Sequence, residues 1–187
     1  MVTHRTPTLL LFCVLAGPLA AAGRPLTIER DQSRVDIAVH ASVDSFTGQL
    51  ARFEPTIAVD EGGRVTAARL EFHFLDVRTG KDGRDKAMHK WQETERFPDG
   101  LFVLASLESA AAPEAGLVAI GRLTLHGVTR DLRFPCSVLR EGEAYTIDGE
   151  AAIDTRDFGL PVIRMLAVLK VDPVVRVKFR LCGRVAG

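Results

Sequence analysis

Apolar and polar residues alternate along most of the chain, and the pattern is clearest over residues 120–134, IGRLTLHGVTRDLRF. Up to Leu125 the side chains alternate between two faces, which is the period of a strand buried on one side. His126 and Gly127 interrupt this pattern, and glycine accepts the positive φ that a tight hairpin turn requires. A second alternating run follows and passes through Phe134. The segment is therefore predicted to form a β-hairpin.

The same period of two recurs in other segments, which are separated by short turns, most of them containing glycine. In the segment 65–77, for example, Leu70, Phe72 and Phe74 share one face. Eight or nine strands are predicted in all, with the main runs at 31–43, 49–59, 65–77, 101–107, 117–125, 128–139, 145–153 and 171–181. Strands joined in this way, without a βαβ rhythm, are typical of an antiparallel sandwich or barrel.

Alternation stops between residues 79 and 92, TGKDGRDKAMHKWQ, where good helix formers gather. Met88, Trp91 and Gln92 lie at helical spacing and form a narrow apolar face, with Ala87 beside it. The pattern predicts one short helix from about Gly83 to Glu93, with the Asp82 carboxylate capping its first turn.

Composition narrows the class of protein. The 187 residues are 47% hydrophobic and 26% charged, which suits one globular domain with a sizeable core. The 24 basic and 24 acidic residues cancel. A nucleic-acid binder would carry a basic stripe, so no nucleic-acid partner is expected.

The first 22 residues have the features of a secretory leader. An apolar run from Leu9 to Leu19 is followed by Ala20, Ala21 and Ala22, the small residues that a signal peptidase prefers. We expect a signal peptide over 1–22, a single domain over 23–187 and a periplasmic or secreted location. Two cysteines remain in that domain, Cys136 and Cys182, and they are either a disulfide or two separate thiols.

Catalytic signatures are missing from the sequence. There is no G-x-S-x-G elbow, no phosphate-binding loop and no dinucleotide fingerprint. The histidines His40, His73, His89 and His126 show no tight metal-ligand spacing. The chain is therefore predicted to have no catalytic residues, no metal site and no cofactor, and not to be an enzyme.

Four motifs together resemble the YceI-like family. LTLHGVTRDL resembles the family's LTxHGVT turn, and VDIAVHASVDSFTG resembles its first strand and turn. GRDKAMHKW followed by FPDGLF is similar to its helix and the strand after it, and IDTRDFGL is similar to its I-x-R-x-D-F-G-[LI] loop. The order of the four motifs is the family's, and together they span nearly the whole of 23–187.

The resemblance implies a lipocalin-like eight-stranded antiparallel β-barrel with one short helix, built around an apolar tunnel that sequesters a polyisoprenoid or a similar long-chain lipid. Each methylene buried there would contribute about 0.8 kcal/mol, so tight binding needs no strong polar anchor. The predicted ligand-binding residues are Val35, Ile37, Val39, Leu70, Phe72, Phe74, Met88, Trp91, Phe102, Leu123, Leu125, Phe134 and Arg84.

Each of these residues also has an alternative interpretation. The apolar side chains form either a tunnel wall or a filled core, and Met88 and Trp91 either cover a tunnel or fasten the helix to the barrel. Arg84 either offers its planar guanidinium to a phosphate head group or forms a structural ion pair.

Alternatives remain open at the level of function too. The expected partner is a lipid, and the chain is either a monomer or a homodimer. One alternative is a quinone-handling accessory of a membrane redox protein, which would add that protein as a partner and a quinone lipid as the bound molecule. Another is a structural or stress-related barrel with no ligand.

Overall fold

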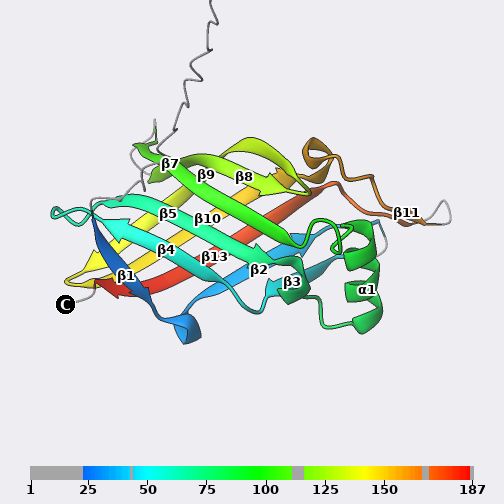
Figure 1. The fold of residues 1–187 in the computed structure, drawn as a ribbon, viewed down its shortest axis with the longest axis horizontal. Helices are drawn as coiled ribbons and strands as arrows, with labels where there is room; N and C mark the ends of the chain where they lie inside the picture. The colour runs from blue at the N-terminus through cyan, green and yellow to red at the C-terminus, as the bar shows by residue number, and fades with distance from the viewer. Residues whose placement is uncertain (1–22, 43, 111–115, 166–168, 186–187) are drawn as a thin grey trace, which may run out of the picture.

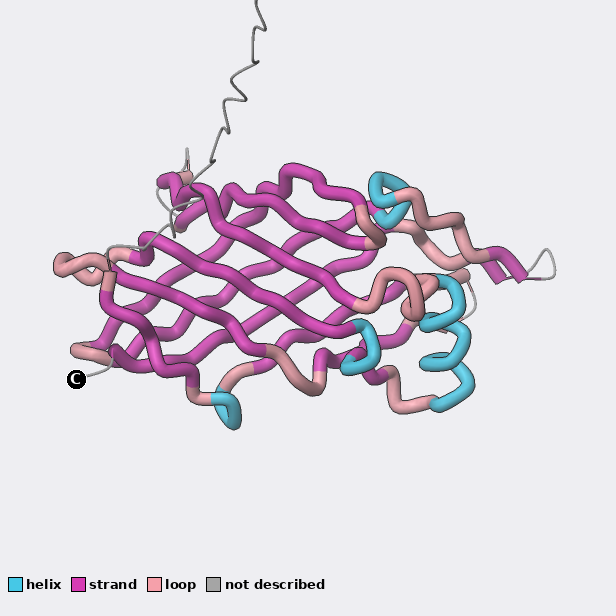
Figure 2. Tube along the Cα trace, in the orientation of Figure 1, coloured by secondary structure: helices cyan, strands magenta, loops and turns pink. Residues whose placement is uncertain are grey.

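A computed structural model describes residues 23–42, 44–110, 116–165 and 169–185. Most of this chain is β-strand, with a single α-helix at one end (Figures 1 and 2). The expected signal peptide, 1–22, lies outside the described residues. Within the described part, no helix has the length and the apolar character needed to span a membrane.

The strands close into an antiparallel barrel, as predicted. Its hydrogen-bonded order is β1-β4-β5-β7-β8-β9-β10-β13, and β13 pairs with β1 again to complete the ring of eight. Strands β2, β3 and β6 continue the sheet from β13. The bounds of these strands are β1 (Arg24–Ile28), β2 (Arg34–Val39), β3 (Phe46–Leu50), β4 (Glu54–Val59), β5 (Val65–His73), β6 (Val77–Arg78), β7 (Asp99–Ser109), β8 (Leu117–Leu125), β9 (Val128–Glu141), β10 (Ala144–Asp154) and β13 (Val174–Val185).

Three positions around the barrel are each filled by two consecutive strands. The 3-10 turn η1 (Arg30–Gln32) separates β1 from β2, residues 51–53 separate β3 from β4, and the 3-10 turn η2 (Phe74–Asp76) separates β5 from β6. The long strand β13 pairs with β1 near its end and with β2 near its middle. The sheet therefore bends while its strands stay hydrogen-bonded to their neighbours. The sequence had predicted one continuous strand over 65–77, and it did not predict β1.

The helix α1 (Asp82–Trp91) connects β6 to β7 and lies at one end of the barrel (Figure 1). Strand β6 pairs with β3, and β7 pairs with β5 and β8, so β6 and β7 are not hydrogen-bonded neighbours in the described sheet. The predicted helix is confirmed, but its predicted cap is wrong. Lys81 occupies the N-cap position without a side-chain hydrogen bond, and Asp82 lies inside the first turn.

The hairpin predicted at His126 and Gly127 is confirmed, because it joins β8 to β9 with φ values of 48° and 72° at these two residues. Two positive φ angles are the signature of a type I′ turn, whose twist matches that of the flanking strands. Thr124 and Thr129 are paired near the end of the β8–β9 ladder, and their hydroxyls lie 2.8 Å apart.

Buried apolar residues form two clusters rather than one central core. One cluster includes Leu26, Ile57 and Tyr145, and the other includes Leu123 and Phe134. Side chains at intermediate depth contact both clusters, namely Phe72, Phe74, Val177 and Phe179. The interior between the clusters is therefore surrounded by apolar side chains that are only partly buried.

Cys136 and Cys182 are free thiols. Cys136 is buried on β9. On β13, Leu181 is buried, and the residue after it is Cys182. Side chains of consecutive strand residues point to opposite faces, so Cys182 points outward while Cys136 points inward. Two thiols on opposite faces of one sheet are not placed for a disulfide.

The two short strands β11 (Arg164–Met165) and β12 (Leu169–Lys170) pair with each other outside the main sheet. They lie at the same end of the barrel as α1, and β13 ends at the other end (Figure 1). The 3-10 turn η4 (Thr155–Phe158) leads from β10 towards this pair.

Candidate functional site

A cavity of about 870 Å³ occupies the interior of the barrel. This volume is near the upper end of the roughly 300–1,000 Å³ range of small-molecule sites. Inward-facing residues of the barrel strands form its wall, together with one face of α1 and residues 160–164. A cavity of this size in a closed barrel has room for a ligand.

All the residues predicted from the sequence to contact a ligand lie on the wall of this cavity. They come from strands β2, β5, β7, β8 and β9, from the turn η2 and from α1, and they are Val35, Ile37, Val39, Leu70, Phe72, Phe74, Arg84, Met88, Trp91, Phe102, Leu123, Leu125 and Phe134. The structure thus brings these residues together, and their contact with a ligand remains a prediction.

The exposure of the wall residues distinguishes a hollow interior from a filled one. Leu70, Phe72 and Phe102 point inward from neighbouring strands, yet each is only half-buried. In a filled core, close packing at crystal-like density would bury such side chains fully. Their remaining exposed surface faces the cavity.

Glycines opposite phenylalanines keep the interior open. Gly149 on β10 pairs with Phe179 on β13, and a Cβ at Gly149 would lie 2.4 Å from the end of the Phe179 ring. Gly100 on β7 stands in the same relation to Phe72 on β5, at 2.2 Å. Each ring therefore lies over the backbone of the neighbouring strand, where any larger residue would push it into the cavity.

Helix α1 is fastened over its end of the barrel by polar contacts. The indole Nε1 of Trp91 donates a hydrogen bond of 2.7 Å to the carbonyl of Pro161. The buried carboxylate of Asp85 accepts from the backbone N–H of Thr79 at 2.9 Å and from its hydroxyl at 2.6 Å. Burial raises the pKa of Asp85, but the Thr79 hydrogen bonds and the nearby Arg78 and His89 outweigh it, so the net pKa is lowered.

Arg84, on the same helix, has protein partners on the cavity wall. Its guanidinium carbon lies 3.8 Å from the centre of the Phe46 ring, and Nη2 lies 3.6 Å from the Asp44 carboxylate. Stacking on an aromatic face with a carboxylate nearby satisfies a guanidinium without any ligand. The structural ion pair that the sequence left open is therefore present.

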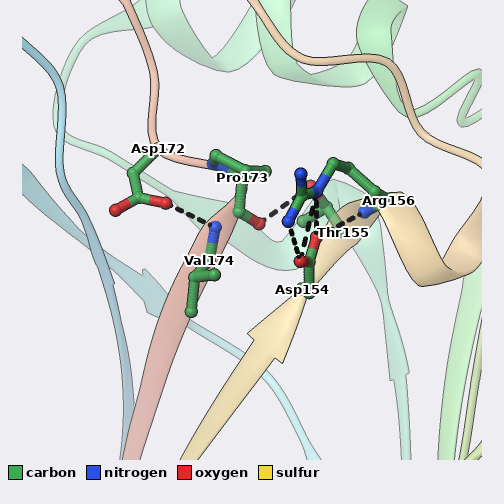
Figure 3. Close-up of polar contacts among 6 residues, drawn as sticks. All are labelled: Asp154, Thr155, Arg156, Asp172, Pro173 and Val174. Carbon is green, nitrogen blue, oxygen red and sulfur yellow. Dashed lines mark hydrogen bonds and ion pairs between the residues drawn. The ribbon is translucent and has the colours of Figure 1, made fainter.

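The loop after β10 is held by hydrogen bonds to the start of β13 (Figure 3). Thr155 donates from its backbone N–H and its hydroxyl to the Pro173 carbonyl, at 2.9 and 3.0 Å. Arg156 donates to both carboxylate oxygens of Asp154, and these side-chain hydrogen bonds lower the pKa of Asp154. The Asp172 carboxylate accepts from the Val174 N–H at 2.9 Å. These contacts give the IDTRDFGL motif a structural role at the edge of the cavity.

His73 and His126 have separate local partners. His73 pairs with Asp99 on the outside of the barrel, and Nδ1 of His126 lies 3.2 Å from the Phe158 carbonyl. The described residues contain no group of three or more His, Cys, Asp or Glu side chains arranged to hold a metal ion.

A family model, the YceI-like domain, matches residues 26–182. The chain belongs to the YceI-like family. The match covers every barrel strand in whole or in part, so the four motifs recognised in the sequence are parts of one domain. None of the curated proteins gives a significant match.

Solved structures share the fold of this YceI-like chain. BcnA of Burkholderia cenocepacia superposes with a TM-score of 0.71 at 17% identity, covering 83% of this chain and 99% of BcnA. A polyisoprenoid binding domain from Saccharophagus degradans, implicated in plant cell wall breakdown, gives 0.62 at 17% identity, covering 88% and 99%. The Campylobacter jejuni YCEI protein gives 0.64 at 15% identity, covering 78% and 88%. At these identities the likeness shows the fold alone.

Part of the cavity wall in this YceI-like chain was missed by sequence reasoning. The omitted residues alternate along β10 and β13 or lie at the end of α1, and they include Ala151, Ile153, Val175, Val177, Phe179, Leu181 and Gln92. The alternation of β10 and β13 was visible in the sequence and would have been enough to include the strand residues. The helical spacing placed Gln92 on the same face as Met88 and Trp91, but its polar side chain kept it out of the predicted ligand-binding residues.

Proposed function

We propose that this chain binds a long-chain isoprenoid or fatty lipid inside its barrel and carries or stores it. The observation that carries the proposal is the cavity of about 870 Å³ with a wall of aliphatic and aromatic side chains. A ligand matched to such a wall is long, slender and apolar. The polyisoprenoid binding domain of Saccharophagus degradans, which shares the fold, supports the same class of ligand.

The energetics favour an aliphatic ligand without a strong polar anchor. Each methylene transferred from water into the cavity contributes about 0.8 kcal/mol. Ten such groups give about 8 kcal/mol before the costs of association, and micromolar binding needs a net free energy of about that size. A chain longer than ten carbons therefore contributes additional binding free energy, which offsets the costs of association.

The proposed place of action is the periplasm or the outside of the cell, in keeping with the leader-like residues 1–22. A carrier there would shield an apolar chain from water. We propose a binding role rather than catalysis, since the wall contains mainly apolar side chains.

The test is identification of the molecule that co-purifies with the protein. Native mass spectrometry of the purified chain should show an added mass that disappears after organic extraction. The extract should contain a long apolar molecule, and ultraviolet absorbance would assign it to the quinones rather than to the isoprenoid alcohols or fatty lipids. Disappearance of the added mass shows that the protein is empty, and binding of chosen lipids can then be measured on it.

Trp91 offers a direct measure of binding, because it is the single tryptophan of the chain and lies on the cavity wall. Titration of the emptied protein with a long-chain isoprenoid alcohol should change its emission in a saturable way. A protein that carries no apolar molecule and gives no response to isoprenoid or fatty probes would refute the proposal.

A further inference from the structure

The buried polar side-chain atoms that lack hydrogen-bond partners gather at one end of the barrel. Among the described residues they are His89 Nε2, both amide atoms of Gln92, Thr94 Oγ1 and His126 Nε2. Three of these residues lie within one and a half turns of each other at the end of α1. His126 reaches the same place from the β8–β9 hairpin, with Nε2 3.9 Å from the Glu93 carboxylate.

Gln92 is the member of this group that lies on the cavity wall. It is the residue directly after α1, where its backbone N–H donates to the Met88 carbonyl at 2.8 Å. The residue is 1% exposed, and neither Nε2 nor Oε1 has a partner among the described residues. A buried amide without partners is costly, because it has lost its hydrogen bonds to water without replacement.

Several polar groups of the wall already have partners within the fold. The hydroxyls of Thr79 and Thr155 donate hydrogen bonds within the fold, and Arg84 has the Asp44 carboxylate beside it. Gln92 therefore differs from them in carrying both a donor and an acceptor that the described residues leave unused, on a buried amide that has to turn to meet a ligand. Its terminal torsion is broad, so the amide turns without movement of the helix backbone.

We propose that the Gln92 amide binds the uncharged polar end of the lipid, a hydroxyl or carbonyl group, and so sets both its orientation and its class. The inference rests on the proposed function. A hydroxyl accepts from the amide N–H and donates to the amide oxygen, which satisfies both. A charged head group buried beside Gln92 would lose its hydration, and the arginine of the same helix, Arg84, is already stacked on Phe46 and lies beside Asp44.

The experiment uses the full chain after organic extraction and three probes: geranylgeraniol, the matching hydrocarbon without the hydroxyl group, and geranylgeranyl diphosphate. Dissociation constants come from the emission of Trp91. The wild type should bind the alcohol about tenfold more tightly than the hydrocarbon, as expected for one or two net hydrogen bonds. The diphosphate should bind more weakly than the alcohol.

The variant Gln92→Leu keeps a similar side-chain size and removes the amide. It should bind the alcohol and the hydrocarbon with nearly equal affinity, and it should unfold at a higher temperature than the wild type when empty. The control Met88→Leu lies one turn earlier on the same wall, and it should keep the tenfold preference.

The outcomes separate this inference from the proposed function. Equal binding of alcohol and hydrocarbon by the wild type, or an unchanged preference in Gln92→Leu, would overturn the role of Gln92 while leaving the carrier function intact. The wild-type comparison is decisive even where the variant fails to fold. Tightest binding by the diphosphate would also overturn it, and binding of no probe at all would remove the proposed function together with the inference.

Discussion

Replacing Gly149 with alanine tests whether the barrel is hollow. The Phe179 ring lies over Gly149 and is perpendicular to the Phe134 ring, with 5.9 Å between the two ring centres. An alanine Cβ would lie 2.4 Å from Cζ of Phe179. Normal carbon contacts are about 3.5–4.0 Å, so the ring must move by more than about 1 Å.

The direction of this movement follows from the sheet. Gly149 and Phe179 are paired in register within the β10–β13 ladder, which extends over eleven pairs of residues and holds both backbones in place. The ring therefore turns into the cavity. In a filled core such overpacking costs about 1–3 kcal/mol, but an empty lumen accepts the ring, so Gly149→Ala should lose less than about 1 kcal/mol of unfolding free energy.

Ligand binding should suffer more than stability does. A ring turned inward occupies the place of roughly two or three methylenes of a bound chain, each contributing about 0.8 kcal/mol. The loss of about 2 kcal/mol corresponds to an increase of about 30-fold in the dissociation constant for a long isoprenoid alcohol. Trp91 emission measures this constant, and urea unfolding measures the stability.

Gly83→Ala is the matched control, because its added Cβ meets nothing within 4 Å and its φ is not positive. It should leave binding unchanged and should not destabilise the fold, since alanine is favoured over glycine in a helix. If Gly149→Ala instead lost about 1–3 kcal/mol of stability or more, as overpacking of a filled core does, the space beside Phe179 would be filled. If it folded normally and bound the alcohol as well as the wild type, the ligand would lie elsewhere.

Three further outcomes are expected. Phe72→Ala should widen an existing cavity, so urea unfolding should show a loss below about 2 kcal/mol instead of the 3–5 kcal/mol of a filled core, and native mass spectrometry should show a shift towards longer ligands. The pKa of Asp85 is lowered from its ordinary 3.8, since hydrogen bonds from Thr79 outweigh the effect of burial. The stability it contributes is therefore complete above about pH 4 and is lost as the pH falls through the lowered pKa, so the urea midpoint should fall less between pH 7 and pH 3 in Asp85→Asn than in the wild type. Trp91→Phe removes the hydrogen bond to the Pro161 carbonyl, and transfer of a fluorescent lipid to vesicles should become about 2- to 10-fold faster; an unchanged rate would mean that this contact does not retain the ligand.

Much of the inner surface of the barrel could be predicted from the sequence. Phe72 and Leu123 were assigned to the inner face because alternate residues of a strand point to the same side, whatever the strand pairs with. The turn at His126 and Gly127 was also local, since its residue types suit the positive φ angles found there. The helix was visible as a break in alternation, although the role of Asp82 in its first turn was not.

Strand β1 illustrates what local pattern misses. Its five residues, Arg24–Ile28, show no distinctive alternation, yet they pair with β4 and β13 and complete the ring. Pairing between residues such as Leu26 and Val185 joins opposite ends of the described chain. A register of this kind depends on the whole barrel and leaves no trace in either segment alone.

The sequence by itself determined which side chains face inward, because the pleat of a strand is a property of the local backbone. Only the tertiary structure decided that the inside is open, because that depends on which residues meet across the ladder. Gly149 lies opposite Phe179 and Gly100 opposite Phe72, so the rings lie against the wall. The unpaired amide of Gln92 became visible in the same way, since a missing partner is a fact about three-dimensional neighbours.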